Sequence, residues 1–364
     1  MRTHLKTLAV AAVTLALLGW FFRQADLSQV WKEIRAAEPW ALLLLLGVTA
    51  LTYLLRALRW QVLLEPLGPT RLREVFRTTV IGFAANTVLP ARIGEIVRPY
   101  LLARRERLSV PATFTTIILE RLLDFVTVLT LLGLFVVFFD PGLDHVNRAV
   151  YGTVKASGLM GAVAAAGILL ILGLNAWRPA LTHRVVEILL RPFPHRLRDR
   201  LSGLVFGLLD GLAVTRDPGR LARAVALSFP LWLSIAAGIW LVTVAFHMTI
   251  PYTGSFLLVA LLTVGVAVPT PGAVGGFHEF FRIGAAVFYG VPNDRAVGAA
   301  IVLHALSFGP VTLLGGLFMV QDGLDLARVR RLGDEARAGA AAVEPEPSDD
   351  SGPDHGAENG AARA

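Results

Sequence analysis

The stretch NTVLPARIGEIVRPYLL, residues 86 to 102, carries the most information about the fold of this chain. It ends a short apolar segment, residues 75 to 89, and a helix needs about 20 apolar residues to cross a bilayer. The stretch combines proline and glycine with two arginines on either side of a glutamate. Irregular backbone at membrane depth persists only where protein or a watery cavity satisfies its polar groups. The stretch therefore predicts a re-entrant elbow at a site inside a membrane protein.

The composition agrees with a helical membrane protein. Of the 364 residues, 55% are hydrophobic and 17% are charged, and the apolar residues come in long blocks. This composition is too apolar for a soluble domain of this length. The chain has no Cys, and its 8 His do not form an HExxH pattern. We therefore expect no metal site and no cofactor.

Six apolar blocks are long enough to span a membrane. They cover residues 5–22, 40–58, 111–139, 158–177, 221–246 and 296–320. Two shorter pieces remain, residues 75–89 and the pair 255–269 with 277–289. Each turns at Pro and Gly before an acid, a pattern typical of discontinuous segments at a transport site. We predict an all-α integral membrane protein with six full transmembrane helices and two opposed re-entrant helical hairpins, and an inverted repeat stays open.

Arginines indicate the orientation of the chain. They concentrate between the second and third crossings and in residues 178–223, which predicts that both termini are cytoplasmic. We expect residues 1–332 to form a translocase-like transmembrane domain in a plasma membrane of the bacterial type. Within it, residues 178–223 are expected to form a basic amphipathic segment on the cytoplasmic side. Residues 333–364 are acidic and poor in large apolar residues, which predicts a disordered tail. The arginines flank hydrophobic spans, so nucleic-acid binding is not expected.

Three charged residues lie inside the third apolar block. Glu120, Arg121 and Asp124 stand nine to thirteen residues into it, near the middle of a membrane. Charges at that depth cost about 2.5 kcal/mol or more each on insertion scales. They therefore face the bundle interior, either as a functional site or as an ion-pair network that only joins helices. Both interpretations stay open, and we favour the functional one.

Arg92, Glu95 and Arg98 surround the first elbow. The planar guanidinium matches phosphate oxygens, so two arginines at the depth of a lipid headgroup suit a phosphate clamp. The alternative is ordinary positive charge on the cytoplasmic side of the membrane. We favour a binding role for Arg92 and Glu95, and the two interpretations of Arg98 stay equal.

Two sets of residues shape the elbows and the second site. The elbow residues are Asn86, Pro90 and Gly94 in the first hairpin and Pro271, Gly272, Gly275 and Gly276 in the second. Glu279 and Arg282 follow the second elbow and complete the predicted substrate site. His278 and His304 are expected to be structural. Arg56 and Arg59 stand beside Trp60, where side chains that reach the membrane interface explain them without a function.

Four motifs in order resemble a known family. They are LRALRW at 55–60, NTVLPARIGEIVRPYLL at 86–102, ILERLLD at 118–124 and VPTPGAVGGFHE at 268–279. Residues 5 to 321 resemble the membrane domain of lysylphosphatidylglycerol synthases and their stand-alone flippase-like relatives. The resemblance implies movement of phospholipid or polyprenyl-linked lipid between leaflets, and it marks the same elbow and charged residues. Aminoacyl transfer in that family belongs to a separate soluble domain.

We expect an integral membrane lipid translocase that moves an anionic phospholipid or a polyprenyl-phosphate-linked lipid, with membrane lipids as its partners. Only 44 residues follow Val320, so we expect no aminoacyl transferase domain and no enzyme activity of that kind. Two alternatives stay open. The chain is a non-transporting partner of a separately encoded lipid synthase or glycosyltransferase, or it is a membrane-embedded lipid-modifying enzyme. A homo-oligomer also stays open.

Overall fold

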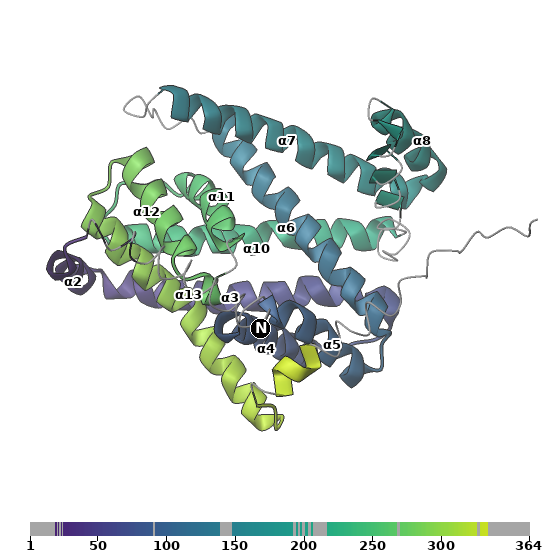
Figure 1. The fold of residues 1–364 in the computed structure, drawn as a ribbon, viewed down its shortest axis with the longest axis horizontal. Helices are drawn as coiled ribbons and strands as arrows, with labels where there is room; N and C mark the ends of the chain where they lie inside the picture. The colour runs from purple at the N-terminus through teal and green to yellow at the C-terminus, as the bar shows by residue number, and fades with distance from the viewer. Residues whose placement is uncertain are drawn as a thin grey trace, which may run out of the picture.

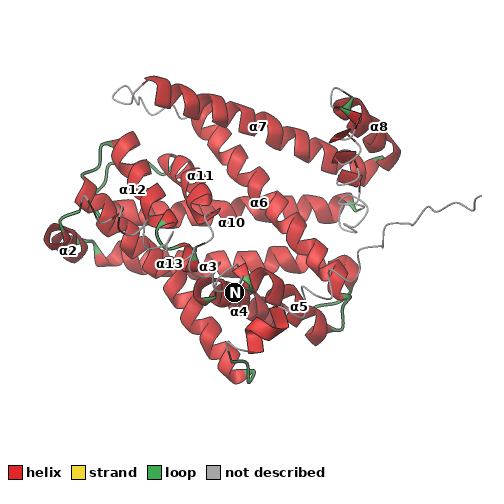
Figure 2. Cartoon of the chain, viewed as in Figure 1, coloured by secondary structure: helices red, strands yellow, loops and turns green. Residues whose placement is uncertain are grey.

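The structure is a computed structural model. It describes Gly19, Phe21, Arg23 and residues 25–333, except 90–91, 139–147, 192–193, 196, 199–200, 203–204, 207–216, 268–269 and 326–327. The described residues form helices and no strand (Figure 2). Most of the predicted first crossing, Pro90, most of the basic stretch after residue 191 and the acidic tail from residue 334 lie outside the described residues.

Five helices are long and apolar enough to cross a membrane. They are α3 (Pro39–Leu64), α6 (Val110–Phe138), α7 (Arg148–Trp177), α10 (Pro218–Ala245) and α13 (Asn293–Gln321). A helix of 26 residues or more extends about 39 Å, which exceeds the ~30 Å hydrocarbon core. Each contains one of the predicted apolar blocks almost entirely. The expected all-α membrane class is therefore confirmed, with five spans among the described residues.

Short helices form at the three predicted short apolar pieces, and a further one, α5, follows the first elbow. They are α4 (Leu72–Val88), α5 (Gly94–Glu106), α11 (Gly254–Ala267) and α12 (Gly276–Tyr289), with the 3₁₀ turn η4 (Pro271–Ala273) before α12. α4 packs against α5, and α11 packs against α12. The order long, short, short, long therefore occurs twice, as α3 to α6 and as α10 to α13. Two further short helices, α2 (Leu27–Ala36) and α8 (Pro179–Leu190), flank these units.

Paired glycines allow both short hairpins to close. A β-carbon on Gly94 would lie 1.8 Å from the carbonyl oxygen of Gly82, so the α4 and α5 backbones meet at this point. A β-carbon on Gly265 would lie 2.7 Å from the carbonyl oxygen of Gly276, which joins α11 to α12 in the same way. Only glycine permits such close backbone approach. The two hairpins therefore share a packing device as well as their place in the order of helices.

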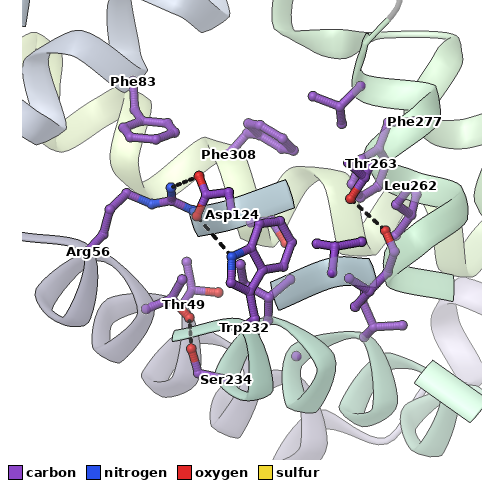
Figure 3. A pocket seen from close by; sticks show the side chains of 18 of the residues that line it. Thr49, Arg56, Phe83, Asp124, Trp232, Ser234, Leu262, Thr263, Phe277 and Phe308 are labelled. Carbon is purple, nitrogen blue, oxygen red and sulfur yellow. Dashed lines mark hydrogen bonds and ion pairs between the residues drawn. The ribbon is translucent and has the colours of Figure 1, made fainter. Parts of the chain in front are cut away.

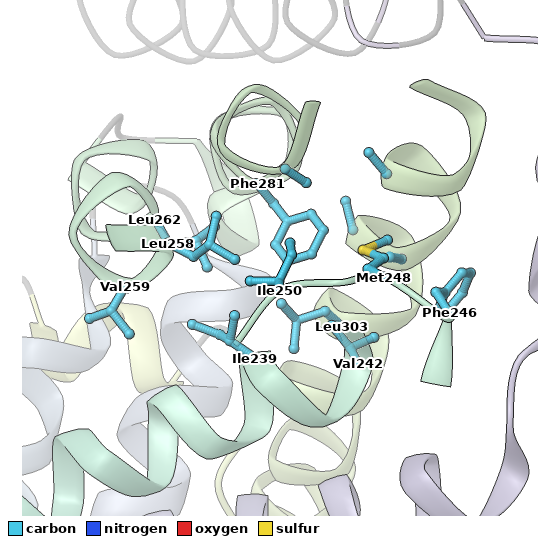
Figure 4. Packing of buried hydrophobic residues seen from close by; sticks show 14 of the residues in the cluster. Ile239, Val242, Phe246, Met248, Ile250, Leu258, Val259, Leu262, Phe281 and Leu303 are labelled. Atoms are coloured by element: carbon cyan, nitrogen blue, oxygen red, sulfur yellow. The ribbon is translucent and has the colours of Figure 1, made fainter. Parts of the chain in front are cut away.

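The long helices pack in pairs around a common interior. α3 runs beside α10, α6 crosses from these helices toward α7, and α13 packs on α4 (Figure 1). The second unit has an apolar core in which Ile239, Leu258, Phe281 and Leu303 come from four different helices and are each at most 3% exposed (Figure 4). This core holds α11 and α12 in place between α10 and α13.

Ion pairs gather at one end of the long helices. Asp322, just after α13, contacts Arg105 at the end of α5 and lies 2.6 Å from Arg77 of α4. Burial opposes the charge on Arg105, but its hydrogen bonds to Asp322 and Glu74 outweigh that effect and raise its pKa. These contacts place the base of the first hairpin and the end of α13 on the same side of the molecule.

A second group of polar contacts marks the opposite end. Arg295, near the start of α13, lies 2.9 Å from Glu33 of α2. The backbone nitrogen of Asp26, before α2, donates to the carboxylate of Asp294 over 3.0 Å. His247, just after α10, lies 3.7 Å from Glu38 at the start of α3. The apolar helices therefore separate two polar ends.

Candidate functional site

Two carboxylates on α6 form the centre of the candidate site. Glu120 and Asp124 are one helical turn apart, and Asp124 is the central residue of the 29-residue α6. Glu120 is 0% exposed and Asp124 is 6% exposed. Buried carboxylates require hydrogen-bonding cations, because an unpaired buried charge is very costly. The neighbouring helices supply these cations.

α3 supplies two of the cations, Arg56 and Arg59. Nη1 of Arg59 lies 2.7 Å from Oδ1 of Asp124, and Nη1 of Arg56 lies 3.8 Å from Oδ2 of the same carboxylate. Both arginines are buried, and α3 continues past them to Leu64. The prediction that these two side chains reach for the membrane interface is therefore wrong. They point inward because α6 carries the carboxylates that pair with them.

α5 and α6 add two more cations. Nη1 of Arg98 donates to Oε1 of Glu120 over 3.0 Å, and its guanidinium stacks 3.8 Å from the ring centre of Trp60. Nη1 of Arg121 donates to Oδ2 of Asp124 over 3.2 Å. The structure therefore brings together the predicted residues of the first elbow and of the third crossing.

Polar side chains outside the ion pairs fix their orientation. The indole nitrogen of Trp232 on α10 donates to Oδ1 of Asp124 over 2.9 Å. Ser228, one turn earlier on α10, accepts from Arg59 over 3.1 Å. The guanidinium of Arg56 lies 4.8 Å from the ring centre of Phe83 on α4. Such cation–π contacts add to the stability of a desolvated arginine.

Arg92 and Glu95 form the exposed edge of the site. Arg92 has a positive φ of 52° in the elbow, and its Nη2 donates to the carbonyl oxygen of Val266 on α11 over 2.5 Å. Its Nη1 lies 3.9 Å from Glu95, and the side chains of the two residues are 42% and 30% exposed. Glu95 also lies 3.8 Å from Arg121. Arg92 therefore links the first hairpin to the second.

These eight residues form a charged cluster with a net positive charge. Its members are Arg56, Arg59, Arg92, Arg98, Arg121, Glu95, Glu120 and Asp124. Five positive and three negative charges leave a formal charge of +2. Several buried donor nitrogens, among them Nε of Arg56, Arg59, Arg98 and Arg121, have no hydrogen-bond partner among the described residues. The charged cluster can therefore accept an additional anion.

A cavity of about 410 Å³ opens beside the charged cluster. Arg56, Arg92, Arg121 and Asp124 line one part of it. Figure 3 shows the guanidinium of Arg56 directed toward Asp124, with Trp232 on the other side of that carboxylate. The remaining wall is largely apolar and comes from α3, α6, α10, α11, α12 and α13. Representative residues of that wall are Leu45, Val128, Ile239, Leu262, Phe277, Leu303 and Phe308.

The second elbow meets the first beside this cavity. Gly272, at a φ of 59°, sits so close to α4 that a β-carbon would lie 3.2 Å from the carbonyl oxygen of Thr87. His304 on α13 is 2.7 Å from the carbonyl oxygen of Gly272 and fixes the turn from the other side. The ring of His278 lies beside that of His304, with ring centres 4.6 Å apart and the ring planes tilted by 36°. These contacts agree with the expected structural role of both histidines.

The other predicted residues of the second elbow surround this contact. Pro271 begins η4, Gly275 has a φ of 91° before α12, and Gly276 begins α12. In the first elbow, Asn86 and Gly94 line a small hollow of about 10 Å³ beside Arg98, room for about one water molecule. The carbonyl oxygen of the Asn86 side chain has no partner among the described residues.

Glu279 and Arg282 form a pair of their own. Arg282 donates to both carboxylate oxygens of Glu279, over 2.8 Å and 2.5 Å, and to the side chain of Asn293 over 2.9 Å. Among the described residues that line the cavity, neither member of this pair appears. The structure therefore places them apart from the cavity, at the start of α12. No group of three or more His, Cys, Asp or Glu is placed to hold a metal ion in the described part of the chain.

Sequence reasoning missed the α3 side of the cavity. Thr49, Thr52, Tyr53 and Arg56 all line it. Their spacing of three, one and three residues puts them on one face of a helix. This polar stripe continues to Arg59, and a polar stripe on one face of an apolar helix indicates that the face lies toward a polar site inside the protein. Trp232 of α10 had no comparable signal, because a single tryptophan in an apolar helix is common at membrane interfaces.

The fold and the site together define a class of protein. It is a helical membrane protein in which long apolar helices enclose a net positive cluster beside an apolar cavity. Residues 7–315 match the family described as the lysylphosphatidylglycerol synthase TM region. The chain belongs to this family, which confirms the resemblance stated from its motifs.

Individual relatives agree with the family assignment. The chain is 27% identical over 341 residues to Glycosyltransferase AglD of Haloferax volcanii. This alignment covers 86% of this chain and 52% of that protein. The chain therefore spans about half the length of this relative. Two UPF0104 membrane proteins of Methanothermobacter thermautotrophicus are 26% and 24% identical to it. These two alignments cover 79% and 84% of this chain and 87% and 89% of the relatives.

Proposed function

We propose that this protein is a lipid translocase that moves an anionic lipid between the leaflets of a membrane. The observation that carries the proposal is the cavity, in which Arg56, Arg92 and Arg121 lie next to a long apolar wall. A lipid has the same division, with a charged phosphate at one end and hydrocarbon chains at the other. Ligand sites of this size combine apolar walls with a few placed polar groups.

The arrangement of the two hairpins supports a transport path. If the five long helices each cross the membrane, three crossings, α6, α7 and α10, separate the first hairpin from the second. An odd number of crossings puts the hairpins on opposite sides, so both are re-entrant and their elbows meet inside. The contacts of Gly272 with Thr87 and of Arg92 with Val266 agree with this arrangement. The two four-helix units then enter the membrane from opposite sides and form an inverted repeat around the cavity. The apolar block at residues 5–22 adds a sixth crossing before the first unit.

The orientation follows from the ends of the helices. The base of the first hairpin and the end of α13 share one end of the molecule, and Arg220 and Arg223 at the start of α10 pair with Glu65 just after α3. Positive charge favours the cytoplasmic side. Both termini are then cytoplasmic, and the cavity lies between the leaflets. Paired interrupted helices of this kind surround the substrate sites of other transporters.

In the proposed mechanism, arginines neutralise the lipid phosphate while the chains stay in the bilayer. Arg92 and Arg121, the most exposed members of the charged cluster, meet the phosphate first. Their planar forks suit its oxygens. Glu95, Glu120 and Asp124 hold the guanidinium groups in position. Glu279 and Arg282 stabilise the start of α12, which supplies Phe277 to the cavity wall.

Transport by the purified protein tests this proposal. The protein is reconstituted in liposomes with fluorescent phosphatidylglycerol or polyprenyl phosphate, and dithionite reduces the label that is exposed outside. Wild type is expected to accelerate the loss of protected signal without any nucleotide, and Asp124→Asn is expected to slow it. If wild type is no faster than protein-free liposomes for several anionic lipids, with and without a proton gradient, the translocase proposal fails.

The relative named a glycosyltransferase supports one alternative. The region shared with this chain covers 52% of that protein, so a membrane region of this kind occurs in one chain with another part. In the alternative, the present chain serves a separately encoded glycosyltransferase or synthase as a membrane partner. Failure of transport by the purified chain, together with recovery of transfer activity from a complex, would favour this alternative. A labelled lipid that the purified chain alters by itself would instead indicate a lipid-modifying enzyme.

A further inference from the structure

The charge balance of the site is +2 for each of three ways of drawing its border. The whole charged cluster has five arginines and three carboxylates. Without Arg92 and Glu95, the exposed pair at its edge, four arginines and two carboxylates remain. The charged residues that line the cavity within the described chain are Arg56, Arg92, Arg121 and Asp124, which again sum to +2. The surplus is therefore the same for the whole charged cluster, for its buried part and for the wall of the cavity.

The single carboxylate of the cavity wall is fully engaged. Oδ1 of Asp124 accepts from Arg59 over 2.7 Å and from the indole of Trp232 over 2.9 Å. Its Oδ2 accepts from Arg121 over 3.2 Å. Oδ2 also lies 3.8 Å from Nη1 of Arg56, so three arginines share this one carboxylate. Nε of Arg56 and Nε of Arg121 have no hydrogen-bond partner in the described structure. Guanidinium groups that share one carboxylate and retain free N–H groups favour an additional anion that supplies both charge and acceptor oxygens.

We propose that the headgroup bound in this cavity is a terminal phosphate, the dianionic group of a lipid phosphomonoester, in preference to the monoanionic phosphodiester of phosphatidylglycerol. This inference rests on the proposed function and names the substrate class of the same site. A phosphomonoester carries about −1.5 to −2 charges near pH 7 and three acceptor oxygens. It therefore matches both the surplus of +2 and the three arginines of the wall. A phosphodiester leaves one charge uncompensated, and the ammonium of a zwitterionic lipid adds a like charge.

The apolar wall determines that the phosphate belongs to a lipid. Free phosphate fits the same arginines, but it leaves the surface made by Ile239, Leu262, Phe277 and Phe308 without a ligand. The part of a lipid chain nearest the headgroup can pack against that surface while the rest of the chain stays in the bilayer, a contact that free phosphate cannot make. A lipid phosphate is therefore expected to bind far more tightly than the free ion, and the two sources are separable by measurement.

Binding to the full-length protein in a neutral detergent tests the inference. The probes are phosphatidic acid, phosphatidylglycerol and phosphatidylcholine with identical acyl chains, together with inorganic phosphate. We expect phosphatidic acid to bind at least tenfold more tightly than phosphatidylglycerol near neutral pH. Lowering the pH to about 5 is expected to reduce that ratio, because the second pKa of a phosphomonoester is about 6. Phosphatidylglycerol has no such group, so its binding serves as the internal control.

Charge variants give a second measurement. Arg121→Gln and Arg92→Gln each lower the balance from +2 to +1 and are expected to bring the ratio of the two affinities close to one. Their side chains are 39% and 42% exposed, so folding tolerates the changes better than at buried Arg59. Arg223→Gln, at the exposed pair with Glu65, is the matched control and is expected to keep the wild-type ratio.

Each contrary result has a distinct meaning. If phosphatidylglycerol binds as tightly as phosphatidic acid, the inference about the phosphomonoester is overturned, while the translocase proposal stands. If inorganic phosphate competes at the same concentration as phosphatidic acid, the lipid assignment is overturned. If phosphatidylcholine binds as well as both anionic lipids, the inference and the proposed function fail together.

Discussion

Nη1 of Arg59 on α3 lies 2.7 Å from Oδ1 of Asp124 at the centre of α6. Arg59 is 0% exposed, and Ser228 of α10 accepts a second hydrogen bond from the same nitrogen. Three long helices therefore meet at one ion pair. Because both charges are buried, the pair fixes how these helices pack and positions the other arginines of the charged cluster.

A double-mutant cycle at this pair is expected to show strong coupling. Removal of one partner breaks the shortest ion pair of the buried cluster and leaves the other charge with longer contacts to Arg121 or Glu120. Loss of a partner from a buried ion pair costs about 3–5 kcal/mol in known cases. Arg59→Met and Asp124→Leu are each expected to lower the free energy of unfolding by an amount of that order. The double variant is expected to lose less than the sum. Unfolding in detergent, followed by tryptophan fluorescence, measures all four proteins.

The exposed pair of Arg223 and Glu65, 2.8 Å apart, is the control for this cycle. Pairs of that kind contribute about 0–1 kcal/mol. Equal coupling in the two cycles would show that the Arg59–Asp124 pair has no special structural role.

Gly94→Ala is expected to destabilise the first hairpin. The new β-carbon would lie 1.8 Å from the carbonyl oxygen of Gly82, and overpacking of this kind costs about 1–3 kcal/mol. Gly265→Ala is expected to act in the same direction in the second hairpin. Thermal unfolding of the purified variants measures both effects.

Gly167→Ala on α7 is the control, because this substitution is not expected to lower stability. No atom lies within 4 Å of its added β-carbon, and alanine is the better helix former by about 0.5–1 kcal/mol. It is therefore expected to leave stability unchanged or to raise it. A Gly94→Ala protein as stable as Gly167→Ala would contradict the described contact between α4 and α5.

Apolar blocks and interrupted segments predicted much of the fold. Hydrophobic length alone located five spans, and the Pro and Gly interruptions located the short helices α4, α5, α11 and α12. These features are local, because a run of apolar residues or a helix breaker acts through its own backbone. The charges of Glu120 and Asp124 were equally visible, since ionisable residues are rare in such helices.

The partners of those carboxylates were harder to predict. Trp60 suggested a membrane interface and therefore an end of the helix, but α3 continues to Leu64 and buries Arg59. The contact between Gly272 and Thr87 joins segments that are far apart in sequence. Such contacts depend on how the long helices pack, which no local pattern specifies. The polar stripe of α3 was the one local signal that would have corrected the assignment.

Arg92→Lys is expected to lose most of the transport activity while the protein accumulates normally. Lysine keeps the charge but lacks the planar fork that binds phosphate oxygens in two places. It also shortens the reach toward the carbonyl oxygen of Val266, which Arg92 contacts over 2.5 Å. Liposome transport and the amount of folded protein are measured together.

Arg107→Lys is the matched control. Arg107 also has a positive φ, 56°, at the other end of α5, and it is exposed. This variant is expected to transport like wild type. Wild-type transport by Arg92→Lys would remove the phosphate clamp and favour a role for general surface charge.

Single cysteines are expected to report the two polar ends. The chain has no Cys of its own, so Ser109→Cys, between α5 and α6, and Thr249→Cys, after α10, give clean labels. Both positions are exposed. An impermeant maleimide is expected to label Thr249→Cys in intact cells and Ser109→Cys only after lysis. The reverse pattern would invert the proposed orientation.

The cavity as the route of the lipid is the central claim, and a blocked cavity tests it most directly. Ser307 on α13 lines the cavity, whereas Leu313 on the same helix is 78% exposed. Transport is measured for Ser307→Trp and Leu313→Trp in liposomes, with folding checked by thermal unfolding. The account predicts that Ser307→Trp folds but transports no faster than protein-free liposomes, and that Leu313→Trp transports like wild type. Wild-type transport by a folded Ser307→Trp protein would show that the lipid does not pass through this cavity.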